Sequence, residues 1–448
     1  MRVIFLAALI LSASIVMDAQ TGAEVMRVDL KECIRIGLQR NFDIQQTYAS
    51  STAAAAGLTQ AFGQYLPGIR LNANYNRQLT NLNEQISIVN GVPIRGEPLP
   101  NTYGINLNAG WTIFNGFARE ADYDAAKSNV DAAENDITFQ RMRVAYLITR
   151  QYLEVLRTER IVVARREQLS LSRATYDRVK ALYDNGRAPI TQLLSQETEV
   201  ANQETEVVRA ENAHDLAKVD LLTLMCVDPT QPVEVDFGAF PSDASSQQID
   251  VFRAQIGTEA QSVERALKSR PDIRSAYDRA KAAESSVTSA ASTYYPTLNA
   301  TGGYVWRNFE IRDFDAQGQW FVGLNFSVPI FDQFQTNRNI QNAKLAHTQR
   351  TIEVERLEQQ IGQGVRSAYL QLAAAEKGLD ISDRALKSAR TSFDAMQERF
   401  NVGGAQLVEL QQANYQLTTA TINRVTAVYA YLDARTFVEF ATGLFGEI

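Results

Sequence analysis

Few residues in this chain could perform chemistry on a substrate. His214 and His347 are the only two histidines among 448 residues, and each stands alone in a segment with helical periodicity. A metal site needs three or four converging ligands, and a serine or cysteine nucleophile needs a histidine beside it. No glycine run has the spacing of a nucleotide-binding loop either. We therefore predict packing or surface roles for both histidines, no enzyme activity, no metal and no cofactor.

The two cysteines, Cys33 and Cys226, are the remaining reactive side chains. An exported chain could join them in one disulfide, because oxidising compartments permit it. The sequence does not place them within reach of each other, so a disulfide and two buried free thiols both remain open. No lipid is expected on Cys33, since it does not follow small residues at the end of an apolar run.

The first 19 residues are typical of a secretory signal peptide, with the basic Arg2, an apolar run at residues 3–16 and the small residue Ala19. No later stretch reaches the roughly 20 apolar residues that a membrane helix requires. The formal net charge is −7, and removal of residues 1–19 leaves it unchanged because Arg2 and Asp18 cancel. This acidic balance argues against a nucleic-acid partner.

The sequence contains a tandem repeat. The stretches "TIFNGF" at residues 112–117 and "PIFDQF" at residues 329–334 lie 217 residues apart, and the same offset relates Gly186 to Gly403. Upstream the offset is 229, so the difference of 12 falls in the loop between two predicted strands. Between the end of the second predicted strand and the glycine at 186 or 403, the two copies therefore have the same length.

This duplication sets the expected domain organisation. We predict a first repeat at residues 20–227, a linker at residues 228–262 and a second repeat at residues 263–448. Each repeat is expected to hold a helix, a β-hairpin and a long helical hairpin. The β-hairpins are placed at about 68–114 and 297–331, and the helical hairpins at about 116–226 and 333–442.

Strands are predicted where apolar and polar residues alternate, because successive side chains of a strand point to opposite faces. In residues 103–113 the odd positions are mostly apolar, while Asn106 and Asn108 occupy even positions. In residues 320–330 the even positions are apolar, and Asn325 lies among the odd ones. Each β-hairpin is therefore expected to have one apolar and one polar face.

Long helices are predicted to follow each β-hairpin. Asn115 and Asp332 occupy favourable N-cap positions, and Gln335 is placed to reach back to Asp332. Nearly 70 residues without proline come next in each copy, which at about 1.5 Å per residue gives a rod of roughly 100 Å. Apolar residues recur at every seventh position from Ile148 to Tyr183 and from Val365 to Phe400, a spacing typical of coiled coils.

Four membrane-type strands cannot close a barrel alone. Single-chain barrels start at about eight strands, and an open edge in hydrocarbon leaves backbone groups unpaired. We therefore predict a homotrimer in which four strands per protomer form a 12-stranded barrel, continuous with a long periplasmic α-helical coiled-coil tunnel. The fold class is mainly α with a membrane β-barrel. The expected membrane-facing aromatic residues are Tyr103, Trp111, Trp306 and Trp320.

From about Leu30 to Gly443 the chain resembles the TolC-like outer-membrane efflux proteins, in its tandem repeat, its strand-to-helix motifs and its glycine-containing helical tips. The resemblance implies the outer-membrane channel of a tripartite efflux or type I secretion system, in a Gram-negative outer membrane with a large periplasmic portion. The channel would be a passive trimeric conduit that performs no chemistry. Its implied partners are a periplasmic membrane-fusion adaptor, an inner-membrane pump driven by protons or ATP, and outer-membrane lipid.

The resemblance also implies roles for the helical tips, "YDNGRAPITQLL" at residues 183–194 and "FNVGGAQLVEL" at residues 400–410. Adaptor contacts are implied at Gly186, Arg187, Ala188, Pro189, Gly403 and Gly404, although the glycines could serve the turn alone. Some relatives carry two acidic residues at the tunnel entrance. Glu409 matches the first and Gln412 occupies the second, so a double acidic ring is in doubt. Three Glu409 carboxylates would favour cations, unless this residue is only a solvated helix position.

The alternative function is a periplasmic coiled-coil scaffold without a pore, which would keep the alternating segments out of the membrane. The cargo cannot be read from the sequence, because in such systems the selecting pocket lies in the pump.

Overall fold

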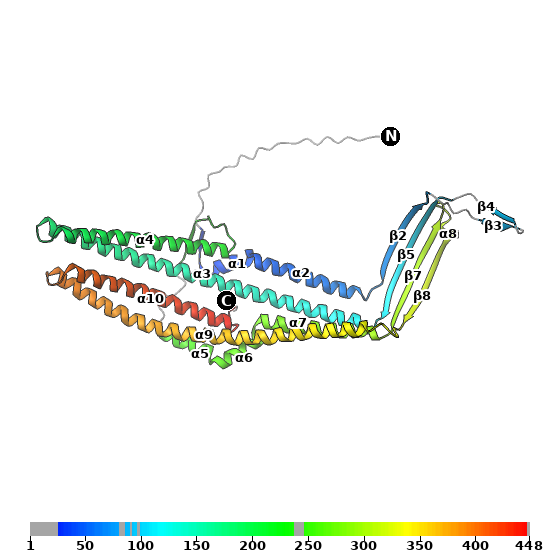
Figure 1. Ribbon diagram of the computed structural model, residues 1–448. Coiled ribbons are helices and arrows are strands. Elements are labelled where there is room, and N and C mark those ends of the chain that lie inside the picture. The colour runs from blue at the N-terminus through cyan, green and yellow to red at the C-terminus, as the bar shows by residue number, and fades with distance from the viewer. Residues whose placement is uncertain (1–25, 80–85, 90–91, 96–98, 237–245, 446–448) are drawn as a thin grey trace, which may run out of the picture. The chain divides into compact units, whose positions relative to one another are not determined.

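The structure, a computed structural model, describes residues 26–79, 86–89, 92–95, 99–236 and 246–445 (Figure 1). The predicted signal peptide, residues 1–19, lies outside the described residues. The chain divides into two compact units. Unit 1 comprises Met1–Asn41, Leu147–Ile249 and Ala375–Asp433, and unit 2 comprises Phe42–Tyr146, Asp250–Ala374 and Ala434–Ile448.

Four helices of the first repeat recur in the same order in the second. The pairs of equal length, with 11, 67 and 35 residues, are α1 (Leu30–Arg40) with α6 (Glu259–Ser269), α3 (Ala118–Asp184) with α9 (Gln335–Asn401), and α4 (Ile190–Leu224) with α10 (Leu407–Ala441). The remaining pair is α2 (Phe42–Gly63) and α7 (Pro271–Ala291). The mainly helical fold and the tandem repeat predicted from the sequence are confirmed.

Unit 2 contains an antiparallel sheet of four strands in the order β2-β5-β7-β8 (Figure 1). The strands are β2 (Gly68–Arg77), β5 (Asn101–Phe114), β7 (Thr297–Asn308) and β8 (Gly318–Ser327). The central pair, β5 and β7, brings the two repeats together, so β2 and β8 form the edges. Beyond β2, the short strands β3 (Ile86–Val89) and β4 (Val92–Arg95) pair as a further hairpin that the sequence pattern did not indicate.

The pairing register divides this sheet into two faces, since residues directly opposite each other on neighbouring strands share a face. Leu71 pairs with Leu107, and Leu107 pairs with Tyr304, which in turn pairs with Trp320. On the other face Asn72 pairs with Asn106. The apolar face consists of Ile69, Leu71, Ala73, Tyr75, Tyr103, Ile105, Leu107, Ala109, Trp111, Leu298, Ala300, Tyr304, Trp306, Trp320, Val322, Leu324 and Phe326.

The long helices begin two residues later than the sequence analysis expected. The chain enters the left-handed region at Gly116 and Phe117 in the first repeat, and at Gln333 and Phe334 in the second. The predicted N-caps still bind the helix start, because Asn115 Oδ1 accepts from the amide of Arg119 (3.3 Å) and Asp332 Oδ2 accepts from the amide of Thr336 (2.7 Å). Each capping side chain therefore spans the turn between strand and helix.

Unit 1 contains the distal parts of two helical hairpins. The first helical hairpin consists of α3 and α4, and the second consists of α9 and α10. The seventh-position residues Val155, Val162 and Leu379 are buried along them. A parallel pair of β1 (Met26–Val28) and β6 (Val233–Val235) joins the start of the chain to the segment between the repeats. That segment, predicted as a linker at residues 228–262, also carries α5 (Ser246–Ile256) and the first turn of α6.

Side chains at equivalent positions of the two repeats donate hydrogen bonds to carbonyls at the ends of α4 and α10. The last carbonyls of a helix have no partner within it. In unit 1, Asn41 Nδ2 donates to the carbonyl of Leu224 (3.5 Å). In unit 2, Arg270 Nη1 donates to the carbonyl of Ala441 (3.1 Å), and the buried Arg270 also pairs with Asp272. No helix within the described residues is both long enough and apolar enough to cross a membrane.

Candidate functional site

The tips of the two helical hairpins are built by the same backbone motif. At the first tip the amide of Gly186 donates to the carbonyl of Tyr183, and the amide of Arg187 donates to the carbonyl of Leu182. This pair of hydrogen bonds ends a helix when its terminal residue adopts a left-handed conformation, which glycine tolerates best. Gly186 has φ +71° and Gly403 has φ +80°. No atom lies within 4 Å of a Cβ built on either glycine, so the conformation alone requires glycine there.

The tips differ at the start of the returning helices. Glu409 Oε2 accepts a hydrogen bond from the amide of Gln406 (2.8 Å), which satisfies a donor at the N-terminus of α10. The equivalent position in the first repeat is Pro189, which precedes α4 and has no amide hydrogen. Gln192 then stands where the second repeat has Glu409. The structure thus gives Glu409 a capping role that the sequence analysis did not foresee.

The residues predicted for adaptor contact lie at the two turns, and all except the half-buried Ala188 are exposed. They are Gly186, Arg187, Ala188 and Pro189 at the first tip, and Gly403 and Gly404 at the second. Arg399 Nη2 donates to the carbonyl of Gly404 (3.1 Å) and holds the second turn. Glu409 and Gln412 are both exposed on the first turns of α10.

Contacts of Arg178 join the hairpins close to the tips, within unit 1. Arg178 Nη1 donates to Asn401 Oδ1 (2.6 Å), and Nη2 donates to the carbonyl of the same residue (3.0 Å). The Arg178 guanidinium also lies 5.8 Å from the ring centre of Phe400. An arginine of one hairpin is therefore fixed to the last residue of α9 in the other.

Further from the tips, amide side chains replace aliphatic ones between the hairpins. Gln196 is only 1% exposed; its Nε2 donates to the carbonyl of Ser172 (3.1 Å), and its Oε1 accepts from Gln411 (2.9 Å). Thr418 Oγ1 donates to Gln168 Oε1 (2.5 Å). Beside them lies a cavity of about 230 Å³. Sequence reasoning missed this seam, because buried amides interrupt the apolar pattern that reveals a coiled coil.

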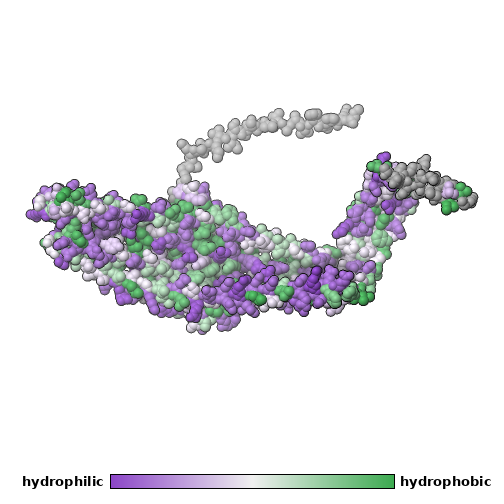
Figure 2. Space-filling view, viewed as in Figure 1, coloured by the Kyte–Doolittle hydropathy of each residue, from purple (hydrophilic) through white to green (hydrophobic). Residues whose placement is uncertain are grey.

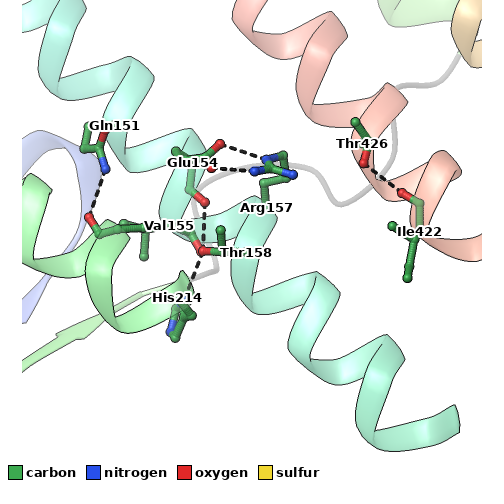
Figure 3. Close-up of polar contacts among 9 residues, drawn as sticks. Gln151, Glu154, Val155, Arg157, Thr158, His214, Ile422 and Thr426 are labelled. Atoms are coloured by element: carbon green, nitrogen blue, oxygen red, sulfur yellow. Dashed lines mark hydrogen bonds and ion pairs between the residues drawn. The ribbon is translucent and has the colours of Figure 1, made fainter. Parts of the chain in front are cut away.

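In the middle of the first hairpin, polar contacts fix α3 against α4 (Figure 3). Gln151 Nε2 donates to the carbonyl of Ala217 (2.9 Å), and Thr158 Oγ1 lies 3.2 Å from His214 Nδ1. Burial and the nearby Lys218 lower the pKa of His214. Among the described residues, no three histidine, cysteine or acidic side chains come together as metal ligands. This histidine therefore lies in the packing between two helices.

Both cysteines are free thiols, so they do not form the disulfide, and only Cys33 is buried, since Cys226 is half-buried. Cys33 on α1 is fully buried, and burial together with the charges of Asp29 and Glu32 raises its pKa to about 12. Cys226 follows α4 with φ +54°, where the second repeat has Gly443 at φ +75°. The cysteine thus occupies a conformation that favours glycine.

The aromatic residues predicted to face the membrane have different surroundings. Trp320 is 74% exposed, and the half-exposed Trp111 donates from Nε1 to the carbonyl of Tyr65 (3.0 Å). Tyr103 stacks on Tyr75 with ring centres 5.0 Å apart. Trp306 lies on the same apolar face by register but is only 1% exposed, because Phe314 of α8 (Phe314–Gln317) stacks on it at 4.5 Å. Phe314 therefore shields Trp306 within this chain, unlike the exposed Trp320.

Further exposed apolar residues gather where the sheet meets the helices. Figure 2 shows hydrophobic residues at the end of the sheet next to α7 and α9. In the second repeat Ile330, Phe331 and Phe334 are largely exposed, and the rings of Phe331 and Phe334 meet edge to face at 5.7 Å. Phe114 and Phe117 repeat this contact in the first copy at 5.4 Å. An apolar band thus borders the sheet at this end.

The chain is similar in sequence and fold to outer membrane efflux proteins and channels. The family described as "Outer membrane efflux protein" matches residues 34–226 and 262–444. The outer membrane protein TolC of Salmonella enteritidis is 26% identical over 174 residues, 37% of this chain and 35% of the relative. TolC of Vibrio cholerae serotype O1 is 20% identical over 408 residues, 89% of this chain and 87% of the relative. The crystal structure of the Campylobacter jejuni CmeC outer membrane channel superimposes with a TM-score of 0.76 at 19% identity, covering 92% of this chain and 85% of that one.

Proposed function

Because the chain belongs to the outer membrane efflux protein family, and is an outer-membrane component of an efflux system, we propose that it works as a passive trimeric channel. Three copies would close a barrel of 12 strands, with the long helices continuing as a periplasmic tunnel. The outer-membrane location of the sheet and the periplasmic location of the helices belong to this proposal.

The observation that carries the proposal is the sheet with one exposed apolar face and two open edges. Val322 is 91% exposed on this face, and Leu71 and Leu324 are also largely exposed. In water such a face is unfavourable by about 25 cal/mol for each Å² of apolar surface. In hydrocarbon the face is favoured, but the edge strands β2 and β8 must then find partners for their backbone groups.

Copies of the same chain would pair the edge strands and let the apolar face contact lipid. If β8 of each protomer pairs with β2 of the next, all edges disappear and the apolar face points outward around the ring. Three protomers give 12 strands, an even number within the range of outer-membrane barrels. A pore-free scaffold would leave most of the apolar face in water, since Val322, Leu324 and Phe326 stay largely exposed although Phe314 covers Trp306.

The helical tips are the proposed docking points for a periplasmic adaptor, which would connect the channel to an inner-membrane pump driven by protons or ATP. Arg187 and Pro189 at the first tip differ from Gly404 and Gln406 at the second, so a trimer would offer two kinds of contact in alternation. The exposed glycines leave the backbone at each turn open to a partner. The channel itself would supply no energy.

A lipid-contact experiment tests the proposed membrane position. Variants that retain only one of Trp111, Trp306 and Trp320 would be reconstituted in vesicles with brominated lipids, which quench nearby indoles. We expect strong quenching of Trp320, weaker quenching of Trp111, and little quenching of Trp306 because Phe314 covers it. Phe314→Ala should expose Trp306 to the quencher and serves as the matched control.

A pore-free scaffold would give different results in these experiments. A scaffold without a barrel would be released from membranes by carbonate washing, and none of its tryptophans would respond to brominated lipid. Purified protein that stays monomeric and soluble without detergent would reject the trimeric channel.

A further inference from the structure

The charges on the polar face of the sheet have one sign. The strands β2, β5, β7 and β8 contain no acidic residue, although the whole chain has 51. By the pairing register, Arg70 and Arg307 lie on the polar face with Asn72, Asn74 and Asn106. The third arginine of the strands, Arg77, lies on the opposite face in line with Tyr75. The polar face therefore carries positive charge alone.

The two arginines of this face occupy different levels. Arg70 shares a row with Asn108 and Gly303, whereas Arg307 shares a row with Gly104 and Asn74. Residues 70 and 74 of the same strand are four positions apart, which at about 3.3 Å per residue separates the rows by roughly 13 Å. Both side chains are exposed, and neither has a hydrogen bond or ion pair with another described residue. Their charges are therefore not neutralised within the sheet.

Among the described residues, three carboxylates follow the end of β7. Glu310 and Asp313 both pair with Arg312, at 2.8 and 3.4 Å, and Asp315 follows on α8. These groups belong to the connection between β7 and β8 and not to the strands. The rows of Arg70 and Arg307 therefore contain no acid from the described strands.

We infer that the interior of the barrel attracts anions, so that solutes carrying a negative charge are favoured in this part of the channel. The inference rests on the proposed trimer, in which the polar face lines the pore. Three copies would then form two rings of three arginines. Rings of arginine favour anions because a narrow passage with low-dielectric walls concentrates their field. This preference would hold although the chain as a whole has a net charge of −7.

Ion selectivity in planar bilayers tests the inference. The reversal potential in a potassium chloride gradient, kept at low ionic strength to limit screening, gives the ratio of chloride to potassium permeability. We expect Arg70→Gln with Arg307→Gln to lower this ratio about two-fold or more. Arg77→Gln removes the same charge from the same strand β2 but from the opposite face, and it should leave the ratio unchanged.

A local measurement separates the barrel from the helical entrance. Asn72 lies on the polar face between the rows of the two arginines. In a Cys226→Gly background, Asn72→Cys would be labelled by anionic and by cationic methanethiosulfonate reagents. The ratio of anionic to cationic rates should fall at least about two-fold when Arg70 and Arg307 are changed to glutamine.

The possible failures can be distinguished. The variant with both arginines changed to glutamine could still form conducting trimers with the permeability ratio and labelling ratio of the wild type. This result would overturn the inference and leave the proposed channel intact. Absence of conductance, together with monomers in detergent, would overturn the proposed channel and the inference with it.

Discussion

Arg178 of the first helical hairpin binds both the side chain and the backbone carbonyl of Asn401 in the second, at 2.6 and 3.0 Å. A planar guanidinium can hold two acceptors at once, so this single side chain fixes the spacing of α3 and α9 close to the tips.

Loss of this contact should loosen the tips. We expect Arg178→Ala to raise the mean single-channel conductance of the trimer, by roughly two-fold or more, because the passage between hairpins would widen. Arg173→Ala is the matched control, since Arg173 pairs with Glu204 inside its own hairpin at 2.6 Å. Equal conductance in both variants would show that the Arg178 contact does not restrict the passage.

The capping role of Glu409 can be separated from a role in ion selection. Glu409→Gln should destabilise α10 by about 0.5–1 kcal/mol, because the amide of Gln406 loses a charged acceptor. Gln406→Pro removes that amide, as Pro189 does in the first repeat, so Glu409→Gln should then have little effect on stability. Thermal unfolding of the two single variants and the double variant measures this coupling.

The same variants test whether Glu409 selects cations at the tunnel entrance. If three Glu409 carboxylates also select cations, Glu409→Gln should reduce the cation preference whether residue 406 is Gln or Pro. A stability coupling without any change in reversal potential would assign Glu409 to the helix start alone.

Cys226 should be replaceable by glycine with a gain in stability. Its φ of +54° disfavours any residue with a Cβ by about 1 kcal/mol, although the greater freedom of glycine in the unfolded chain offsets part of this. We expect Cys226→Gly to raise the unfolding temperature by about 1–2 °C. The opposite change in the other repeat, Gly443→Ala, should lower it, because the new Cβ would lie 3.0 Å from Ser269 Oγ. A fall in both variants would contradict this account.

Alkaline pH should destabilise the protein through Cys33. Its pKa is raised by burial from an ordinary value of 9.0 to about 12, so the folded state keeps the thiol proton more tightly than the unfolded state does. The resulting stabilisation is fully present below about pH 9 and is lost as the pH rises toward about 12.

Unfolding temperatures of the wild type and Cys33→Ala across this range provide the measurement. The alanine variant should lose packing by a constant amount at every pH, but its stability should fall less steeply above pH 9. Burial and then the charge of Cys33 also raise the pKa of Tyr152, so Cys33→Ala removes part of that shift and changes the slope in the same direction. Parallel curves would exclude a contribution from Cys33.

Much of the fold was predictable because its signals are local and occur twice. The alternation in residues 103–113 and the turn glycines Gly186 and Gly403 each report a backbone conformation that neighbouring residues impose. The shared offset of 217 then requires α3 and α9 to have the same length, which the structure confirms at 67 residues each.

The features that sequence reasoning missed depend on contacts between distant residues or on unusual backbone angles. Phe117 and Phe334 adopt left-handed conformations that aromatic residues rarely take, so the helix starts were placed two residues too early. Trp306 is covered by Phe314, whose position after β7 is not visible in the alternation of the strand. The pairing of Gln196 with Gln411 likewise requires knowledge of how the two hairpins meet.

The matched lengths of the long helices also limit how this gene can change over time. An insertion of a few codons in α3 alone would carry residue 178 out of register with residue 401, and one tip would project beyond the other. Insertions and deletions should therefore persist only in compensating pairs, one in each half of the gene, so that relatives with longer or shorter helices differ by the same number of residues in both repeats.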